Sequence, residues 1–130
     1  MKNKYIIGID LGGTNLKIAL FDCQFRFKSR KFRATGNFSC RESLIAGIVE
    51  AILKIIKDNK LQNCDILGVG LGLPGPIDVE KGLVHFFPNI PGWMDVPLVK
   101  ILKIRTGLPV FIDNDANLMC LAEYKLGSAK

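Results

Sequence analysis

Two short runs of polar residues and glycines carry the side chains that could handle phosphate. The first is Asp10-Leu11-Gly12-Gly13-Thr14, directly after an apolar run. Glycines leave backbone N–H groups free to face an anion, and an adjacent carboxylate could hold Mg²⁺, which binds through one or two carboxylates and phosphate oxygens. Taken alone, the run is equally consistent with a hairpin closed by a Gly-Gly turn. Lys17 could reach a bound phosphate, although an exposed hairpin lysine is the commoner explanation.

The second run is Asp113-Asn114-Asp115-Ala116-Asn117, which also follows an apolar run. Transfer of phosphate to an alcohol requires a carboxylate that accepts the hydroxyl proton and neighbouring groups that hold the hydroxyls in place. Asp115 and Asn114 fit these two roles. The alternative is that Asp113 or Asn114 caps a following helix, which accounts for one of the four polar residues but not for all of them.

A stretch rich in proline, glycine and asparagine lies between these two runs. At Gly75 the backbone could approach a ligand closely, and the Asn89 amide could bind sugar hydroxyls, although turn formation is the commoner role of both residue types. His85 has no acidic residue nearby, so we interpret it as a packed or surface side chain. Trp93 could stack on a sugar, but in a Pro-Gly-Trp context it is more often a packing anchor.

Composition bounds the class of protein. A length of 130 residues with 48% hydrophobic residues predicts one domain with one core. The net charge of +6 suits polyphosphate ligands, and the basic run at residues 26–33 alternates with phenylalanines as a solvated edge strand does, so we expect no nucleic-acid partner. Four widely spaced cysteines and one histidine predict no zinc site. No apolar stretch reaches membrane-spanning length, so we expect a cytoplasmic protein without membrane contact.

Hydrophobic periodicity predicts an α/β domain with a mixed sheet. The predicted elements are strands at Tyr5–Leu11, Asn15–Asp22, Phe25–Ala34, Ile66–Leu73 and Leu108–Ile112, helices at Cys40–Asn59, at Pro97–Arg105 and from Asp113 or Asn114 to about Lys125, and a small hairpin around Glu80–Gly82. Gly12 and Gly13 would join the first two strands in a hairpin. Ligands of such sheets gather at the carboxyl ends of strands, so the runs at Asp10 and Asp113 and the turn at Gly70–Gly75 should converge on one edge.

Together, these segments resemble the ROK family of sugar kinases and related repressors, which belongs to the actin-like, ribonuclease-H-like ATPase superfamily. The resemblance covers nearly the whole chain, and its four ordered motifs are Ile9–Thr14, Gly72–Asp78, Pro88–Trp93 followed by Val96-Pro97-Leu98, and Asn114–Asn117. It implies a ribonuclease-H-like lobe with a mixed five-stranded sheet, made of three antiparallel strands plus parallel strands, flanked by helices. Residues 1–130 would form the N-terminal lobe, and the absence of a C-terminal lobe would make the chain a fragment.

The resemblance also implies a nucleotide site at the first motif. Asp10 and Thr14 would belong to the Mg-ATP site, with Gly12 and Gly13 along the phosphates and Asp10 contacting Mg²⁺ indirectly. Lys17 would remain a secondary phosphate contact. The implied cofactors are therefore ATP and Mg²⁺.

The later motifs imply a sugar site beside it. Gly75, Asn89 and Asn114 would hold the sugar, together with Asp115. The Asp115 carboxylate would be the general base that takes the proton from a hexose hydroxyl. Glucose is the leading expectation, and its hydroxyl at carbon 6 would then receive the phosphate to give glucose 6-phosphate.

ROK kinases carry a second lobe with further phosphate and sugar ligands, and phosphoryl transfer depends on positioning from both sides of the cleft. We therefore expect the chain alone to be inactive or nearly so, and the full-length protein to be a homo-oligomer. One alternative is a fragment of a sugar-sensing transcriptional regulator of the same family, although such members usually place a winged helix before the first motif. Another alternative is a non-catalytic, actin-like interaction lobe.

Overall fold

The computed structural model describes residues 3–12, 15–34, 39–87 and 90–114. Within this part of the chain the elements are β1 (Tyr5–Leu11), β2 (Asn15–Asp22), β3 (Phe27–Ala34), α1 (Arg41–Asp58), the short 3-10 helix η2 (Asn63–Asp65), β4 (Ile66–Leu73), β5 (Ile77–Asp78), β6 (Leu83–Val84), α2 (Leu98–Thr106) and β7 (Val110–Asn114). The helix predicted to end near Lys125 lies outside the described residues, as does Gly13 of the predicted hairpin turn.

The main sheet has five strands in the order β3-β2-β1-β4-β7. β1 pairs antiparallel with β2, and β2 pairs antiparallel with β3. β4 pairs parallel with both β1 and β7. The mixed sheet with three antiparallel strands and two further parallel strands is therefore confirmed, as is the small hairpin, which consists of β5 and β6.

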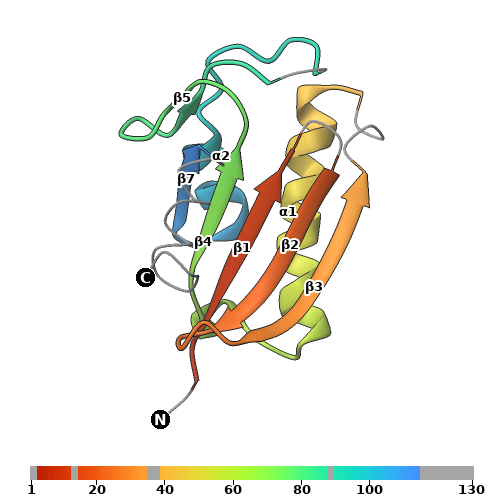
Figure 1. Cartoon of the computed structure of the whole chain (residues 1–130), viewed down its shortest axis with the longest axis vertical. Helices are drawn as coiled ribbons and strands as arrows, with labels where there is room; N and C mark the ends of the chain where they lie inside the picture. Colours follow the sequence, from red (N-terminus) through yellow and green to blue (C-terminus); the bar gives the residue numbers. More distant parts are fainter. Residues whose placement is uncertain (1–2, 13–14, 35–38, 88–89, 115–130) are drawn as a thin grey trace, which may run out of the picture.

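Both helices lie on one face of this sheet. The connection from β3 through α1 to β4 and the connection from β4 through α2 to β7 both run toward the β7 edge. Crossovers between parallel strands are right-handed, so two crossovers in the same direction place their helices on the same side. Figure 1 shows α1 behind β1, β2 and β3, and α1 also contacts α2.

Alternating side chains of the strands form one core with these helices. The buried residues include Ile7, Ile9 and Leu11 of β1, Leu16, Ile18 and Leu20 of β2, and Leu44, Ile48, Ile52 and Ile55 of α1. Each fully buried aliphatic side chain stabilises the fold by about 1.5–3 kcal/mol relative to an exposed one. The residues between them in the strands face the other side of the sheet, which the two helices do not cover.

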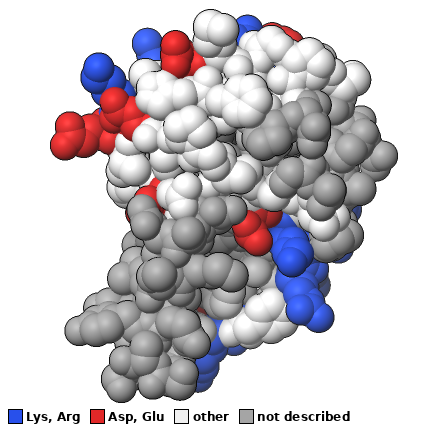
Figure 2. All heavy atoms as spheres, turned by 45° about the horizontal axis from the view of Figure 1, so that its top comes forward, with Lys and Arg blue, Asp and Glu red and all other residues white. Residues whose placement is uncertain are grey.

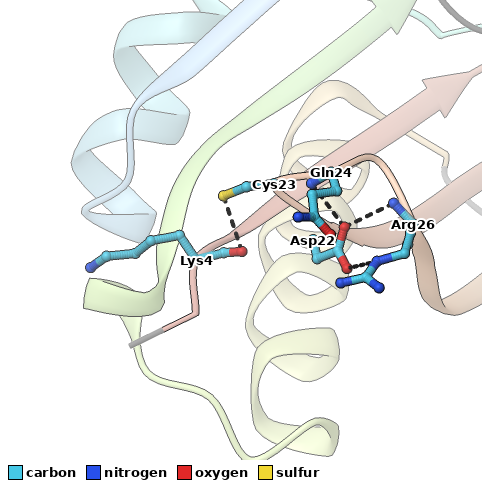
Figure 3. Close-up of polar contacts among 5 residues, drawn as sticks. All are labelled: Lys4, Asp22, Cys23, Gln24 and Arg26. Carbon is cyan, nitrogen blue, oxygen red and sulfur yellow. Dashed lines mark hydrogen bonds and ion pairs between the residues drawn. The ribbon is translucent and has the colours of Figure 1, made fainter. Parts of the chain in front are cut away.

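Asp22 forms the turn between β2 and β3 (Figure 3). One of its carboxylate oxygens accepts hydrogen bonds from the backbone N–H groups of Gln24 and Arg26, both at 2.9 Å, and the other accepts one from Arg26 Nε at 2.7 Å. Within this turn Phe25 has a left-handed φ of 64°. A residue in that conformation cannot continue a strand, so β3 begins at Phe27 rather than at Phe25 as the periodicity predicts.

The Asp22 turn should make stability depend on pH. The hydrogen bond from the Arg26 backbone N–H, with the further contacts to Asp22, holds the pKa of this carboxyl below its usual range. A carboxyl whose pKa is lowered by folding stabilises the fold above its unfolded pKa of about 3.9, and that contribution is lost as pH falls through the folded value. Asp22→Asn should therefore lower stability at pH 7 and flatten the loss of stability on the acid side, which urea unfolding across this pH range measures.

Glu80→Gln is the matched control, because Glu80 is exposed and makes no hydrogen bond or ion pair with any described residue. It should retain the pH dependence of the unaltered chain. If Asp22→Asn also retained that dependence, the turn would not be its source.

The turn of the β5–β6 hairpin packs against α2 at Gly82. Val99 N–H donates a hydrogen bond to Gly82 O at 3.3 Å, and Gly82 has a left-handed φ of 68°. A Cβ atom at Gly82 would lie only 2.7 Å from Val99 Cβ. The turn can therefore rest on α2 only with glycine at this position.

Gly82→Ala should destabilise the fold by about 2–4 kcal/mol, because it combines left-handed strain with overpacking. Urea unfolding measures the change. Gly70→Ala in β4 is the control, since a Cβ at Gly70 would have no atom within 4 Å. That variant should stay within about 0.5 kcal/mol of the unaltered chain, and an equal loss for both variants would exclude the contact with Val99 as the cause.

Candidate functional site

The register of the sheet places two carboxylates in one row at the carboxyl ends of the parallel strands. Asp10 of β1 is the partner of Gly72 in β4, and Gly72 is the partner of Asp113 in β7. Their sequence neighbours Ile9, Leu71 and Ile112 are buried on the helix side. The row therefore faces the opposite side of the sheet, with the Asp10 and Asp113 backbones about 10 Å apart and no side chain between them, because the middle residue is glycine.

Asp10 is exposed and lies opposite Lys17 across the β1–β2 pair. Neither side chain makes a hydrogen bond or an ion pair with any described residue. The structure therefore brings these two sequence-predicted residues together without pairing them. Asp10 can accept a cation, and Lys17 can reach an anion, without first breaking a contact with any residue that the structure describes.

Gly12 closes the β1 side of the first turn, where its N–H donates a hydrogen bond to Asn15 O at 2.8 Å. A Cβ at Gly12 would lie 3.7 Å from that oxygen, which is an ordinary van der Waals distance. The described part of the chain therefore does not itself require glycine here. A bound group that approaches the backbone closely would require it.

Asn114 lies next to Asp113 but faces the other side of the sheet, as its partner Leu73 does. Its Nδ2 donates a hydrogen bond at 3.3 Å to the carbonyl oxygen of Gly75, which is exposed and has a left-handed φ of 85°. The predicted convergence of this run with the glycine turn is therefore confirmed for Asn114 and Gly75. The helix that the capping alternative requires lies outside the described residues, so that alternative stays a prediction.

His85 differs from the interpretation based on sequence, because it does have an acidic neighbour. Its Nδ1 lies 2.6 Å from Asp95 Oδ1. The two residues are ten positions apart, and Val84 and Val96 beside them form an antiparallel bridge with two backbone hydrogen bonds of 2.9 Å. This pairing between β6 and the returning chain has no signal in local periodicity, so sequence reasoning missed the His85–Asp95 contact.

Trp93 is a packing residue, as the sequence favours. It is 4% exposed, and its ring centroid lies 5.5 Å from that of Phe87, which is also buried. The indole Nε1 has no hydrogen-bond partner among the described residues. A side chain this buried offers no open face for sugar stacking.

Four of the predicted site residues, Gly13, Thr14, Asn89 and Asp115, lie outside the described residues. The described residues place Asp10, Gly12, Lys17, Gly75 and Asn114 at one end of the sheet, the upper end in Figure 1. With that end brought forward in Figure 2, the Lys and Arg side chains on the visible face form separate groups rather than one continuous basic surface.

Two further observations apply only to the part of the chain that the structure describes. No group of three His, Cys, Asp or Glu side chains there is close enough to hold a metal ion without other ligands. No helix there is long and apolar enough to cross a membrane.

The sheet order, the helix placement and the acidic and glycine-rich carboxyl edge define the class of this domain, an α/β lobe of the actin-like ATPase fold. The model of the ROK family matches residues 6–130, and the chain belongs to the ROK family.

Individual relatives agree with this placement. The chain is 38% identical over 125 residues to a glucokinase of Thermotoga maritima, with 96% of this chain and 38% of that protein aligned. It is 35% identical over 122 residues to a xylose repressor of Caldicellulosiruptor bescii, with 94% of this chain and 30% of that protein aligned. The crystal structure of a ROK family glucokinase from Streptomyces griseus in complex with glucose and AMPPNP superposes with a TM-score of 0.83 at 31% identity, covering 97% of this chain and 38% of that one. The chain thus spans less than half the length of these relatives.

Proposed function

We propose that this chain is the N-terminal lobe of an ATP-dependent hexose kinase that converts glucose to glucose 6-phosphate. The observation that most directly supports this proposal is the arrangement at the end of β7, where two neighbouring residues face opposite sides of the sheet. Asp113 joins the row with Asp10, whereas Asn114 binds the Gly75 turn. A phosphate donor on one side and an alcohol acceptor on the other would meet at this strand end. The Streptomyces griseus relative was crystallised in complex with glucose and AMPPNP, which supports a site for both kinds of ligand.

The nucleotide would bind along the first turn. Gly12 would let the phosphates approach the backbone closely, and Gly13 would present its backbone N–H group to them. Thr14 and Lys17 would add a hydroxyl and a positive charge. Asp10 fits a hard divalent cation, since it is an exposed carboxylate without a competing partner among the described residues. Bound Mg²⁺ would neutralise phosphate charge, and Asp10 would hold it through water.

The sugar would bind on the other side of the strand end. Gly75, Asn89 and Asn114 would fix its hydroxyls, and Asp115 would accept the proton of the carbon-6 hydroxyl as that oxygen attacks the γ-phosphorus. A new oxygen–phosphorus bond forms, the bond from phosphorus to the β,γ-bridging oxygen breaks, and ADP leaves. The reaction would draw on cytoplasmic ATP, so we propose the cytoplasm as its location. We also propose that the full-length protein assembles as a homo-oligomer.

The alternative is a sugar-sensing regulator, which the similarity to a xylose repressor favours. A regulator would bind the sugar without needing the Asp10 row or Asp115 for catalysis. A non-catalytic interaction lobe would need neither ligand. Ligand binding and turnover therefore separate the three functions.

The decisive test is Asp115→Asn in a chimera in which this chain replaces the matching segment of the Thermotoga maritima glucokinase. The chimera should release ADP from Mg-ATP with glucose, measured in a coupled assay over a panel of hexoses. The variant keeps the size of the side chain but cannot accept the proton, so kcat should fall by about 10²- to 10⁴-fold. Full kcat in the variant would reject Asp115 as the base. Sugar binding without turnover in the unaltered chimera would favour the regulator.

Gly12→Ala tests the nucleotide site separately. The added methyl group would stand where the phosphates approach. The affinity of the chimera for Mg-ATP should therefore fall at least tenfold, as measured by calorimetric titration. Stability should change by less than about 0.5 kcal/mol, because the Cβ fits the described chain. Gly70→Ala, in the same sheet but before the strand end, should leave the affinity unchanged. An unchanged affinity in Gly12→Ala would place the phosphates elsewhere.

A further inference from the structure

The turn at Gly75 and Pro76 is held from two sides. On one side Asn114 Nδ2 donates to Gly75 O at 3.3 Å. On the other side the His85 N–H donates to Pro76 O at 3.1 Å, and a Cβ at Gly75 would lie 3.6 Å from the carbonyl oxygen of Phe86. The position of the turn therefore depends on the backbone at residues 85 and 86.

Asp95 fixes that backbone through two contacts with one residue. Its N–H donates a hydrogen bond to His85 O at 3.2 Å, and its carboxylate Oδ1 lies 2.6 Å from His85 Nδ1. His85 is thus bonded to Pro76 through its N–H, and to Asp95 through both its carbonyl oxygen and its ring. It links the turn to the chain segment that returns toward α2.

Asp95 holds a conformation that an ordinary L-residue avoids. Its φ is 51°, in the left-handed region, which aspartate adopts more readily than most non-glycine residues but which still disfavours an L side chain. Such strain persists only where surrounding contacts determine the conformation, and it is concentrated at functional sites. Among the described residues, the contacts that determine it are the two with His85, together with the neighbouring bridge between Val84 and Val96.

Both side chains are nevertheless substantially exposed, 42% for His85 and 61% for Asp95. Exposed pairs of this kind contribute little to global stability. An exposed pair that adds little stability but fixes the path of one turn is suited to positioning rather than to holding the core together.

We propose that the His85–Asp95 pair is a positioning device for the sugar site, which holds the Gly75-Pro76 turn in the geometry that binds the hexose. The proposal rests on the proposed function, because it assigns the turn to sugar binding. The pair touches neither reacting atom, so it sets the affinity for the sugar and leaves the phosphoryl-transfer step unchanged.

The test is His85→Ala in the chimera described above, with His85→Asn as the conservative variant. Alanine retains both backbone hydrogen bonds of residue 85 but removes the ring, whereas the asparagine amide nitrogen lies as many bonds from Cα as His85 Nδ1 and can still donate to Asp95. His85→Ala should raise KM for glucose about tenfold with kcat within about twofold, and His85→Asn should restore most of the loss. Met94→Ala is the control, because Met94 is 77% exposed and lies beside Asp95; its KM should not change.

An unchanged KM in His85→Ala, an equal fall in kcat, or no recovery in His85→Asn would each overturn the proposal. A second readout needs no sugar. His85 is the only histidine of this chain. When the histidines of the other segment of the chimera are replaced or left unlabelled, the one imidazole signal in the NMR spectrum comes from His85 and reports its contact with Asp95. Amides around the Gly75 turn should exchange with solvent faster in His85→Ala.

The same measurements separate this proposal from the proposed function. If the unaltered chimera neither binds nor phosphorylates any hexose, the proposed function fails and the sugar-positioning role fails with it. If it phosphorylates glucose and His85→Ala changes only the exchange of the turn amides, the kinase stands and the positioning role alone is overturned.

Discussion

The parallel pairing of β1 with β4 is the constraint on which the rest of the structure depends. It fixes Ile9 against Leu71 on the helix side and Asp10 against Gly72 on the side away from the helices. Because side chains alternate along a strand, a slip of one residue would turn Asp10 into the core and expose the apolar side chains that cover α1. Burial of that apolar face is worth far more than any single polar contact, so the core determines where the carboxylate stands.

The strands and helices could be predicted from the sequence because each has a clear hydrophobic period. Both β1 and β2 were predicted with their observed bounds, and the helix around Leu44–Ile56 was also evident. The start of β3 was predicted wrongly because Asp22 makes three hydrogen bonds within a few residues, and those contacts outweigh the alternation at Phe25. A side chain that bonds its own backbone leaves no periodic signal.

The sequence allowed us to predict which residues of the candidate site lie at the strand ends, but not on which face of the sheet each side chain lies. Adjacent polar residues in the sequence suggested one cluster, whereas β7 extends through Asp113 and Asn114 and sends them to opposite faces. The acidic neighbour of His85 could not be found either, because the bridge between Val84 and Val96 that brings the pair together depends on how the chain after β6 returns toward α2. Predictions at Gly13, Thr14, Asn89 and Asp115 remain predictions, since these residues lie outside the described structure.

The close contact between Gly82 and Val99 limits how the lobe can move. The hairpin rests on α2, α2 contacts β7, and β7 ends at the residue that binds the Gly75 turn. Mechanically, these parts form a closed ring of contacts, so bending at one of them strains the others. The β5–β6 hairpin is therefore expected to move with the sheet as one rigid body, and any hinge in the protein would lie outside this ring.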